Sequence, residues 1–165
     1  MPRYQVVPTD DASAIAKEVD RQLATLRRLT GRDPTHLDSH QHVHRSDPVG
    51  AVLRDLARKL AIPLREHTPQ VQYLVVFYGQ TATGAPLPDH LSVKALVRVL
   101  QTLPPGVTEL GCHPGEGDDL DSTYCAERAI EVKTLCHPEV RGTVIAEGIV
   151  LRSFHGILTL MERSV

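Results

Sequence analysis

Apolar side chains recur every three or four residues along several stretches of the chain, a spacing that predicts amphipathic helices. The first predicted helix runs from Asp11 to Thr30, and Gly31 follows it as a typical stop residue. A second helix is expected after Asp47, a candidate N-cap, with Pro48 as its first residue. Similar patterns predict further helices that begin after Ser92 or cover residues 124–135 and 138–147.

Short apolar runs between these helices are typical of buried strands. We predict extended segments over residues 35–38, 62–66, 71–78, 107–112 and 149–154. Strands that alternate with helices indicate right-handed crossovers and a mainly parallel sheet. The expected fold class is therefore α/β, with four to five βα units in a single domain over residues 1–165.

Polar side chains follow three of the predicted strands. The segment 40–44 follows the first strand, residues 65–67 end the second, and His113 comes directly after Cys112 at the end of another. Because functional groups in parallel sheets gather at the carboxyl ends of strands, we expect a site there.

The composition excludes several classes of protein. The 165 residues carry a formal net charge of -2, which gives no electrostatic reason to expect nucleic acid or a membrane surface as a partner. No stretch approaches the ~20 apolar residues of a membrane-spanning helix, so we expect a cytoplasmic protein. Three cysteines without a Cys-x-x-Cys spacing are expected to be reduced thiols, with Cys112 buried in strand packing.

Histidines are concentrated in residues 36–44. If this segment is extended, its period of two places one carboxylate and four imidazoles on one face, namely His36, Asp38, His40, His42 and His44. These groups are ligands that zinc and related metals prefer. Neighbours on that face lie ~6.5 Å apart, so one or two of them would bind the ion while others orient ligands or contact substrate. A hydrogen-bonded strand end without a metal is the alternative.

A second candidate is the Cys112-His113-Pro114 segment. The proline favours an extended backbone that presents the His113 imidazole, for which general acid or base is a suitable role. The following acidic loop is expected to cap the next helix through Asp121 or Ser122.

Two further patterns lie in the predicted helical region. The second Cys-His-Pro, at residues 136–138, is interpreted as a helix boundary. Arg128 and Glu131 are three residues apart, a spacing that favours an ion pair, with loop or substrate anchoring as the alternative.

The chain resembles the YdjC-like carbohydrate deacetylase family from its first helix to Phe154. The resemblance rests on Gly31-Arg32-x-Pro34-Thr35-His36-Leu37-Asp38-Ser39-His40-x-His42-Val43-His44, Cys112-His113-Pro114, Tyr124-Cys125 with Arg128-x-x-Glu131, and Ile145-Ala146-x-x-Gly148-Ile149-x-Leu151.

The resemblance implies a (β/α)-barrel-like hydrolase that acts on linear amide C–N bonds and removes N-acetyl groups from small amino sugars. It implies one divalent metal ion, Mg or Zn, with His40 as a metal ligand and His113 as proton donor to the leaving amine. Residues expected to orient the ligands or contact the acetylated saccharide are His36, Asp38, His42, His44, Arg65, Arg128 and Glu131.

The sequence also departs from the family pattern. Family members begin with a strand that ends in Asp-Asp-Phe-Gly, which supplies a metal ligand and the catalytic base, and a later Gly-x-His supplies another ligand. Neither motif occurs here, and Asp10-Asp11 is interpreted as a helix cap. A closed barrel needs about 250 residues. The chain is therefore expected to be an incomplete barrel, the carboxyl-terminal part of the family, which a complementary N-terminal chain or upstream sequence would complete. Whether it is active alone stays open at this point.

Two other functions stay open at this point. A noncatalytic remnant of the fold would bury its exposed sheet edge by forming a homo-oligomer. A histidine-triad nucleotide hydrolase would explain His40-x-His42-x-His44, but that motif requires apolar residues where Gln41, Arg45 and Ser46 stand.

Overall fold

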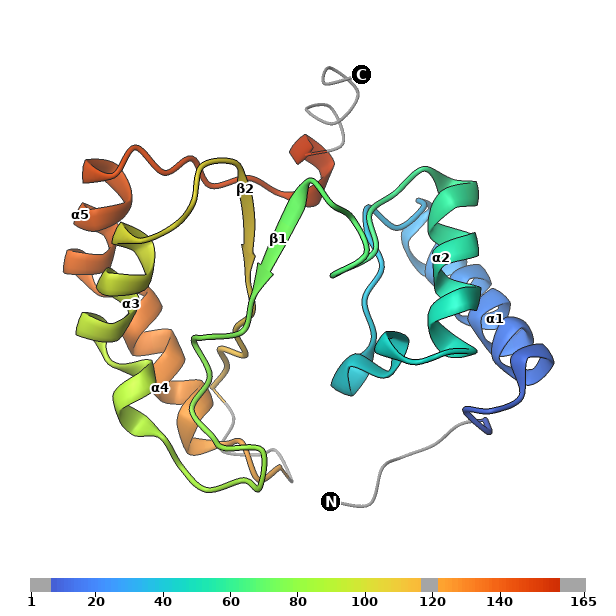
Figure 1. Ribbon diagram of the computed structural model, residues 1–165, viewed down its shortest axis with the longest axis horizontal. Helices are drawn as coiled ribbons and strands as arrows, with labels where there is room; N and C mark the ends of the chain where they lie inside the picture. Colours follow the sequence, from blue (N-terminus) through green and yellow to red (C-terminus); the bar gives the residue numbers. More distant parts are fainter. Residues whose placement is uncertain (1–6, 117–121, 158–165) are drawn as a thin grey trace. The chain divides into compact units, whose positions relative to one another are not determined.

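The computed structural model describes residues 7–116 and 122–157, which form an α/β fold with parallel pairing, as predicted (Figure 1). The chain divides into two compact units. The first contains the chain up to Pro69 together with the residues from Arg152, and the second contains Gln70–Leu151. The single domain over residues 1–165 stays a prediction.

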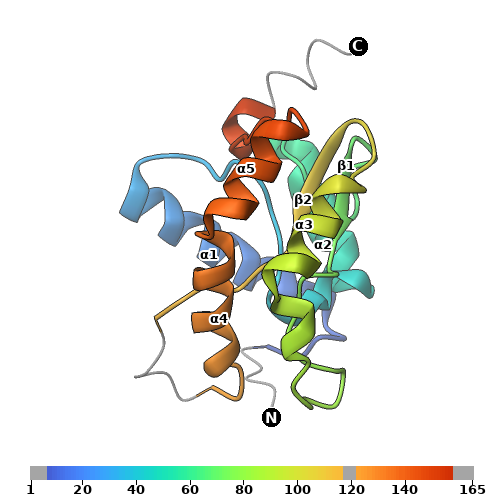
Figure 2. The same ribbon diagram turned by 90° about the vertical axis from the view of Figure 1, so that its left-hand side faces the viewer.

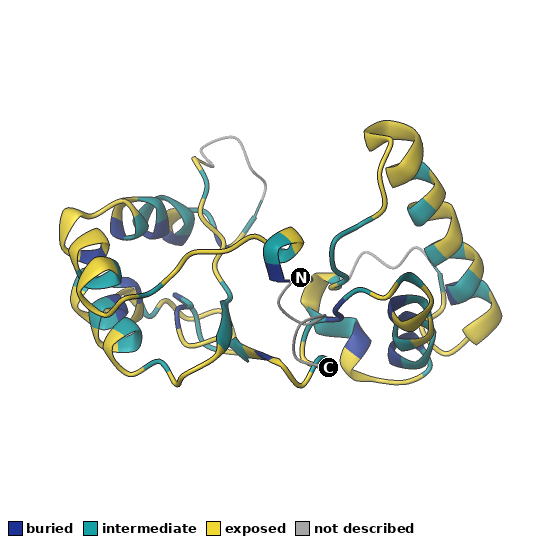
Figure 3. Cartoon of the chain, turned by 90° about the horizontal axis from the view of Figure 1, so that it is seen from above, coloured by how far each residue is buried: buried dark blue, intermediate teal, exposed yellow. Residues whose placement is uncertain are grey.

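The first unit is built on helices α1 (Ala12–Thr30) and α2 (Val49–Leu60), which pack against each other. The Asp11 carboxylate accepts a hydrogen bond from the Ala14 amide at 2.9 Å, which confirms its predicted role as a helix cap. The core of this unit contains Ile15, Val49, Leu53, Ala57 and Leu64. Most of α1 is exposed, so its apolar stripe is covered mainly near its start (Figure 3).

A single parallel bridge joins Leu37 to Leu64 in the first unit. The Leu37 amide donates to the Pro63 carbonyl at 2.8 Å, and the Arg65 amide donates to the Leu37 carbonyl at 3.0 Å. The strands predicted over residues 35–38 and 62–66 are therefore reduced to this bridge. A helical turn begins soon after Leu37, and the Thr68 hydroxyl closes a turn on Leu64, so neither segment continues as a strand.

The second unit contains a two-stranded parallel sheet, formed by β1 (Val71–Leu74) and β2 (Val107–Leu110) with Val71 opposite Val107. Its helices are η2 (Pro88–Leu91), α3 (Val93–Gln101), α4 (Ala126–Leu135) and α5 (Pro138–Ala146). Helices α3, α4 and α5 lie on one side of the strand pair (Figures 1 and 2). Their core is formed by Phe77, Leu91, Leu96 and Val140.

Several predicted boundaries are confirmed in the second unit. The Ser92 hydroxyl accepts from the Ala95 amide at 3.2 Å and caps α3. The second Cys-His-Pro separates two helices as expected: Cys136 ends α4, and the His137 imidazole accepts from the Glu139 amide and caps α5.

Other predictions were wrong. The strands expected over 71–78 and 107–112 are shorter, and 149–154 is no strand, because Val150 and Leu151 are exposed rather than paired with a sheet edge. Pro48, not Asp47, precedes α2, since the Asp47 carboxylate accepts a hydrogen bond from Arg54 at 2.8 Å.

Two expectations concerned the region around the acidic loop. Cys112 is exposed, because β2 ends at Leu110. Asp121 lies outside the described residues, and Cys125, not Ser122, is the N-cap position of α4.

Within residues 7–116 and 122–157, no helix combines the length and the apolar character that crossing a bilayer requires.

Candidate functional site

The histidine-rich segment is not extended as predicted. From His40 to Arg45 it forms the 3₁₀-helix η1, interrupted by left-handed backbone at Gln41 (φ 53°) and His42 (φ 53°). This compact turn cancels the expected alternation, so the histidines do not share one face. His44 is fully buried, His42 is partly buried and His40 is exposed.

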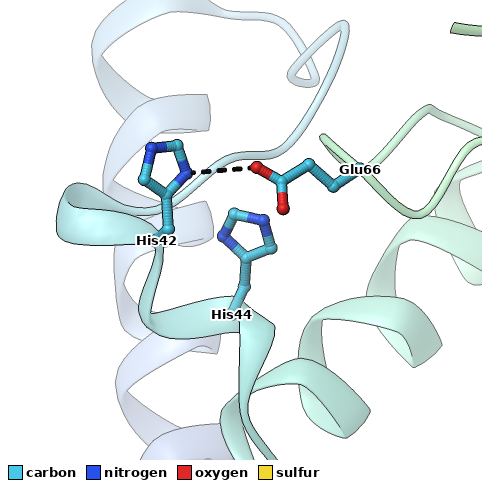
Figure 4. Close-up of side chains that lie close together, drawn as sticks. All are labelled: His42, His44 and Glu66. Atoms are coloured by element: carbon cyan, nitrogen blue, oxygen red, sulfur yellow. Dashed lines mark ion pairs between the residues drawn. The ribbon is translucent and has the colours of Figure 1, made fainter. Parts of the chain in front are cut away.

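The turn brings His42 and His44 together with Glu66, and we call these three residues the histidine–glutamate cluster. One candidate ligand atom from each lies within 4.8 Å of the others, and His42 Nδ1 lies 3.6 Å from Glu66 Oε1 (Figure 4). Ligand atoms around a tetrahedral zinc ion are about 3.4 Å apart, given bonds of about 2.0–2.1 Å. To hold such an ion, the ligand atoms would move closer by up to about 1.4 Å and Glu66 would release Arg45.

The position of Glu66 follows from the parallel bridge. The segment with His42 and His44 leaves the bridge after Leu37, and Glu66 leaves it two residues after Leu64. The prediction that polar groups meet at the carboxyl ends of neighbouring parallel segments is thus confirmed here. Sequence reasoning noted Glu66 at a strand end but did not include it among the candidate ligands.

The electrostatics of the cluster are mixed, because its imidazoles are neutral but the Arg45 guanidinium already pairs with the Glu66 carboxylate. Burial lowers the pKa of both His42 and His44, which keeps the imidazoles neutral and their lone pairs available near pH 7. A hydrogen bond from Arg45 holds the pKa of Glu66 below its ordinary value, so this carboxylate is charged. The donor set is two nitrogens and one anionic oxygen.

Ser39 fixes the orientation of His44. Its hydroxyl lies 2.6 Å from His44 Nδ1 and also accepts from the His44 amide at 3.1 Å. His44 Nε2 is buried and meets no partner of ordinary hydrogen-bond geometry within residues 7–116 and 122–157, although the Arg65 backbone acts to raise the pKa of this imidazole. Buried polar atoms are nearly always paired, so this nitrogen indicates a ligand that completes the cluster, and the residues present fit a divalent metal ion.

The backbone around the cluster is strained. Gln41, His42 and Glu66 all have positive φ angles, which are uncommon for residues other than glycine. Such conformations cost about 1–3 kcal/mol each and concentrate at functional sites. Their presence in both segments of the cluster supports a role beyond packing.

The other candidates in the first unit have different surroundings. His40 and Asp38 line an open cavity of about 820 Å³ beside α1, and His40 as a metal ligand stays a prediction. The His36 ring stacks on Phe154 with centroids 3.9 Å apart. Asp38 also forms an ion pair with Arg65 at 2.8 Å.

In the second unit, His113 lies against a stacked pair of tyrosines. Its ring makes edge contacts with Tyr78 and Tyr124, each with centroids 5.6 Å apart, and the two tyrosine rings stack at 4.8 Å. Tyr78 lies just beyond β1 and His113 just beyond β2, so these groups also meet at the carboxyl ends of parallel strands. The role of His113 as proton donor stays a prediction.

Arg128 and Glu131 both bind the loop that carries His113. Their spacing favoured an ion pair between them, with loop anchoring as the alternative, and the structure shows the loop anchoring. Arg128 donates to the carbonyls of Tyr124 at 3.0 Å and His113 at 3.5 Å. Glu131 accepts from the backbone amide of His113 and from the Tyr124 hydroxyl. Tyr124 was named from the sequence only as part of the family motif and was assigned no role in the site.

Comparison with known proteins gives a family match over residues 3–146, to the YdjC-like proteins. The chain belongs to this family. The predicted resemblance is thus confirmed for most of the sequence, and it extends to the histidine–glutamate cluster and the His113 loop alike.

Curated relatives of this YdjC-like chain are named chitooligosaccharide deacetylases. The Serratia marcescens protein is 28% identical over 159 residues, which cover 87% of this chain and 60% of the relative. The Yersinia pestis (strain Pestoides F) protein is 29% identical over 165 residues, covering 88% and 62%. The YdjC-like chain therefore spans about three fifths of the length of the relatives it matches.

A solved structure shares the fold. It is a protein of Enterococcus faecalis V583 named for a candidate role in cellobiose-phosphate cleavage, 25% identical with a TM-score of 0.72. The match covers 89% of this YdjC-like chain and 61% of that structure.

Proposed function

We propose that this chain is a metal-dependent carbohydrate deacetylase that removes N-acetyl groups from small amino sugars. The observation that carries the proposal is the buried, unpaired Nε2 of His44 beside His42 and Glu66. Together with relatives named chitooligosaccharide deacetylases, it supports a hydrolase that uses a bound cation.

His42, His44 and Glu66 would hold the cation. Two imidazole nitrogens favour zinc over magnesium, which prefers oxygen ligands, so zinc is the metal we propose. When bound, a divalent cation would polarise the acetyl carbonyl and lower the pKa of a water molecule. His40, on the wall of the open cavity, is proposed as a further metal ligand, and Asp38 on the same wall is proposed to contact the sugar.

His113 is proposed to supply a proton to the leaving group. In amide hydrolysis the oxygen of water bonds to the acetyl carbon, the C–N bond breaks, and the departing nitrogen takes up a proton. An imidazole is suited to this transfer because it gains and loses a proton near neutral pH. The products are acetate and the free amino sugar.

The assembly is also a proposal. We propose that the chain acts as a homo-oligomer or together with a complementary N-terminal chain. Light scattering at micromolar concentration tests the homo-oligomer: a monodisperse monomer contradicts it. Cytoplasmic location and the absence of a nucleic-acid partner stay predictions.

The test is acetate release from short acetylated chitooligosaccharides. Protein stripped by a chelator and reloaded with zinc should release acetate, and His44→Gln should lose both bound zinc and activity. His90→Gln, an exposed histidine in η2, is the matched control. For the proton donor, His113→Gln should lose activity while keeping zinc, and His137→Gln in the other Cys-His-Pro should be unaffected. Purified chain that holds no stoichiometric zinc or magnesium and releases no acetate refutes the proposal for this chain acting alone.

A further inference from the structure

We propose that Glu131 is a positioning residue that fixes the place of the His113 imidazole. The inference rests on the proposed function for the role of His113 as proton donor, but the position of its imidazole can be measured without any catalytic activity. Three observations carry it, namely the burial of Glu131, the donors that meet its carboxylate, and the tyrosine that these contacts hold.

Glu131 is a fully buried acidic residue in the middle of α4. Burying a carboxylate is costly unless hydrogen bonds replace the water that it loses. Both of its oxygens accept such bonds: Oε1 from the Tyr124 hydroxyl at 2.5 Å, and Oε2 from the backbone amide of His113. The carboxylate is therefore hydrogen-bonded to the Cys-His-Pro loop and to Tyr124 rather than to a basic side chain of its own helix.

The connection continues through Tyr124. Its hydroxyl accepts a hydrogen bond from the Gly79 amide at 2.9 Å while it donates to Glu131. Gly79 follows β1 and His113 follows β2, so a single carboxylate links the segments that leave both strands of the sheet. Such linked hydrogen bonds fix their partners more strongly than isolated ones.

The same contacts reach the imidazole ring. Tyr124 touches the His113 ring edge-on and stacks on Tyr78, which makes an edge contact with His113 at the same distance. Glu131 thus holds the backbone of His113 directly and its ring through Tyr124. A shift of about 1 Å in a reacting group can cost about 100-fold in rate, so this restraint matters for a proton donor.

The test compares Glu131→Gln with Glu127→Gln. Glu127 lies one turn earlier on α4, is also buried, and accepts from the Gln80 side chain at 2.9 Å. Replacing Glu131 by glutamine keeps the size of the side chain but turns one acceptor into a donor, so one of the two donors that face it loses its acceptor.

NMR of the full chain provides the main readout. The His113 amide proton should resonate far downfield in the native protein, move upfield in Glu131→Gln together with the His113 ring signals, and stay in place in Glu127→Gln. If Glu131→Gln does not fold, Tyr124→Phe replaces it, and should move the ring signals while the downfield amide is kept. Any of three results overturns the proposal. The native His113 amide shows no downfield shift, the ring signals do not move in Tyr124→Phe, or both glutamate variants change the spectrum equally.

Kinetics separate the two proposals. Where acetate release is measurable, Glu131→Gln should lower kcat by about 10- to 100-fold with KM unchanged. An unchanged kcat contradicts the positioning role. A chain that shows the NMR changes but releases no acetate contradicts deacetylase activity of this chain alone and leaves the positioning of His113 established.

Discussion

Removing the Ser39 hydroxyl should weaken zinc binding without touching a ligand. Ser39→Ala deletes the group that lies 2.6 Å from His44 Nδ1 and that accepts from the His44 amide at 3.1 Å. The imidazole then loses the contact that orients its ring beside Glu66. Loss of such an outer hydrogen bond typically costs 10- to 100-fold in metal affinity. At about 1.4 kcal/mol for each factor of ten, this is about 1.4–2.8 kcal/mol of binding free energy.

The same substitution should lower stability. Two hydrogen bonds at about 1 kcal/mol each amount to about 2 kcal/mol of unfolding free energy, measured by urea denaturation. Ser39→Thr is the matched control, because it keeps the hydroxyl and Ser39 has extended backbone (φ -143°, ψ 146°) that suits a β-branched residue. Zinc affinity is measured by competition with a coloured chelator. An affinity for Ser39→Ala within twofold of the native value, or an equal loss in Ser39→Thr, refutes the reasoning.

Three further predictions concern stability. Gly79→Ala should lower the free energy of unfolding by about 1–3 kcal/mol in urea denaturation, because a Cβ there would lie 2.5 Å from a buried leucine side chain. Gly142→Ala on helix α5 should instead raise it by about 0.5–1 kcal/mol, because a Cβ there would meet no atom within 4 Å. Leu96→Ala, in the core of the second unit, should cost about 2–5 kcal/mol by the same method, and a loss below 1 kcal/mol would contradict the core assignment. A hydrogen bond from Arg21 lowers the pKa of Glu18 to about 2. The stabilisation that this ion pair gives the folded state should therefore be complete above pH 4.5 and be lost as the pH falls through about 2. NMR titration of the Glu18 carboxyl checks this, and an ordinary pKa refutes it.

The helices could be predicted from the sequence because their signals are local. Asp11 and Ser92 are hydrogen-bonded to amides three residues ahead, and Gly31 adopts the left-handed conformation that ends a helix. Strand lengths were less predictable, because a strand ends where its partner ends. Val150 and Leu151 form an apolar pair without a neighbouring edge, and no local pattern shows this.

The candidate site was predicted in location but not in detail. The density of histidines identified the segment, yet the left-handed conformations at Gln41 and His42 depend on the tertiary structure, since neither residue is a glycine. Glu66 lies more than twenty residues from His44 in sequence, and only the rule that polar groups gather at strand ends indicated that the two would meet. The Arg128-x-x-Glu131 spacing predicted a local pair, but the partner amide of Glu131 lies 18 residues away in sequence.

Arg45 gives the histidine–glutamate cluster its own counterion. Its guanidinium grips both oxygens of Glu66, with distances of 2.7 and 2.6 Å. The carboxylate is therefore neutralised before any cation arrives, unlike in zinc fingers, whose metal-free chains unfold. Any cation that entered the cluster would therefore have to displace the Arg45 guanidinium from Glu66.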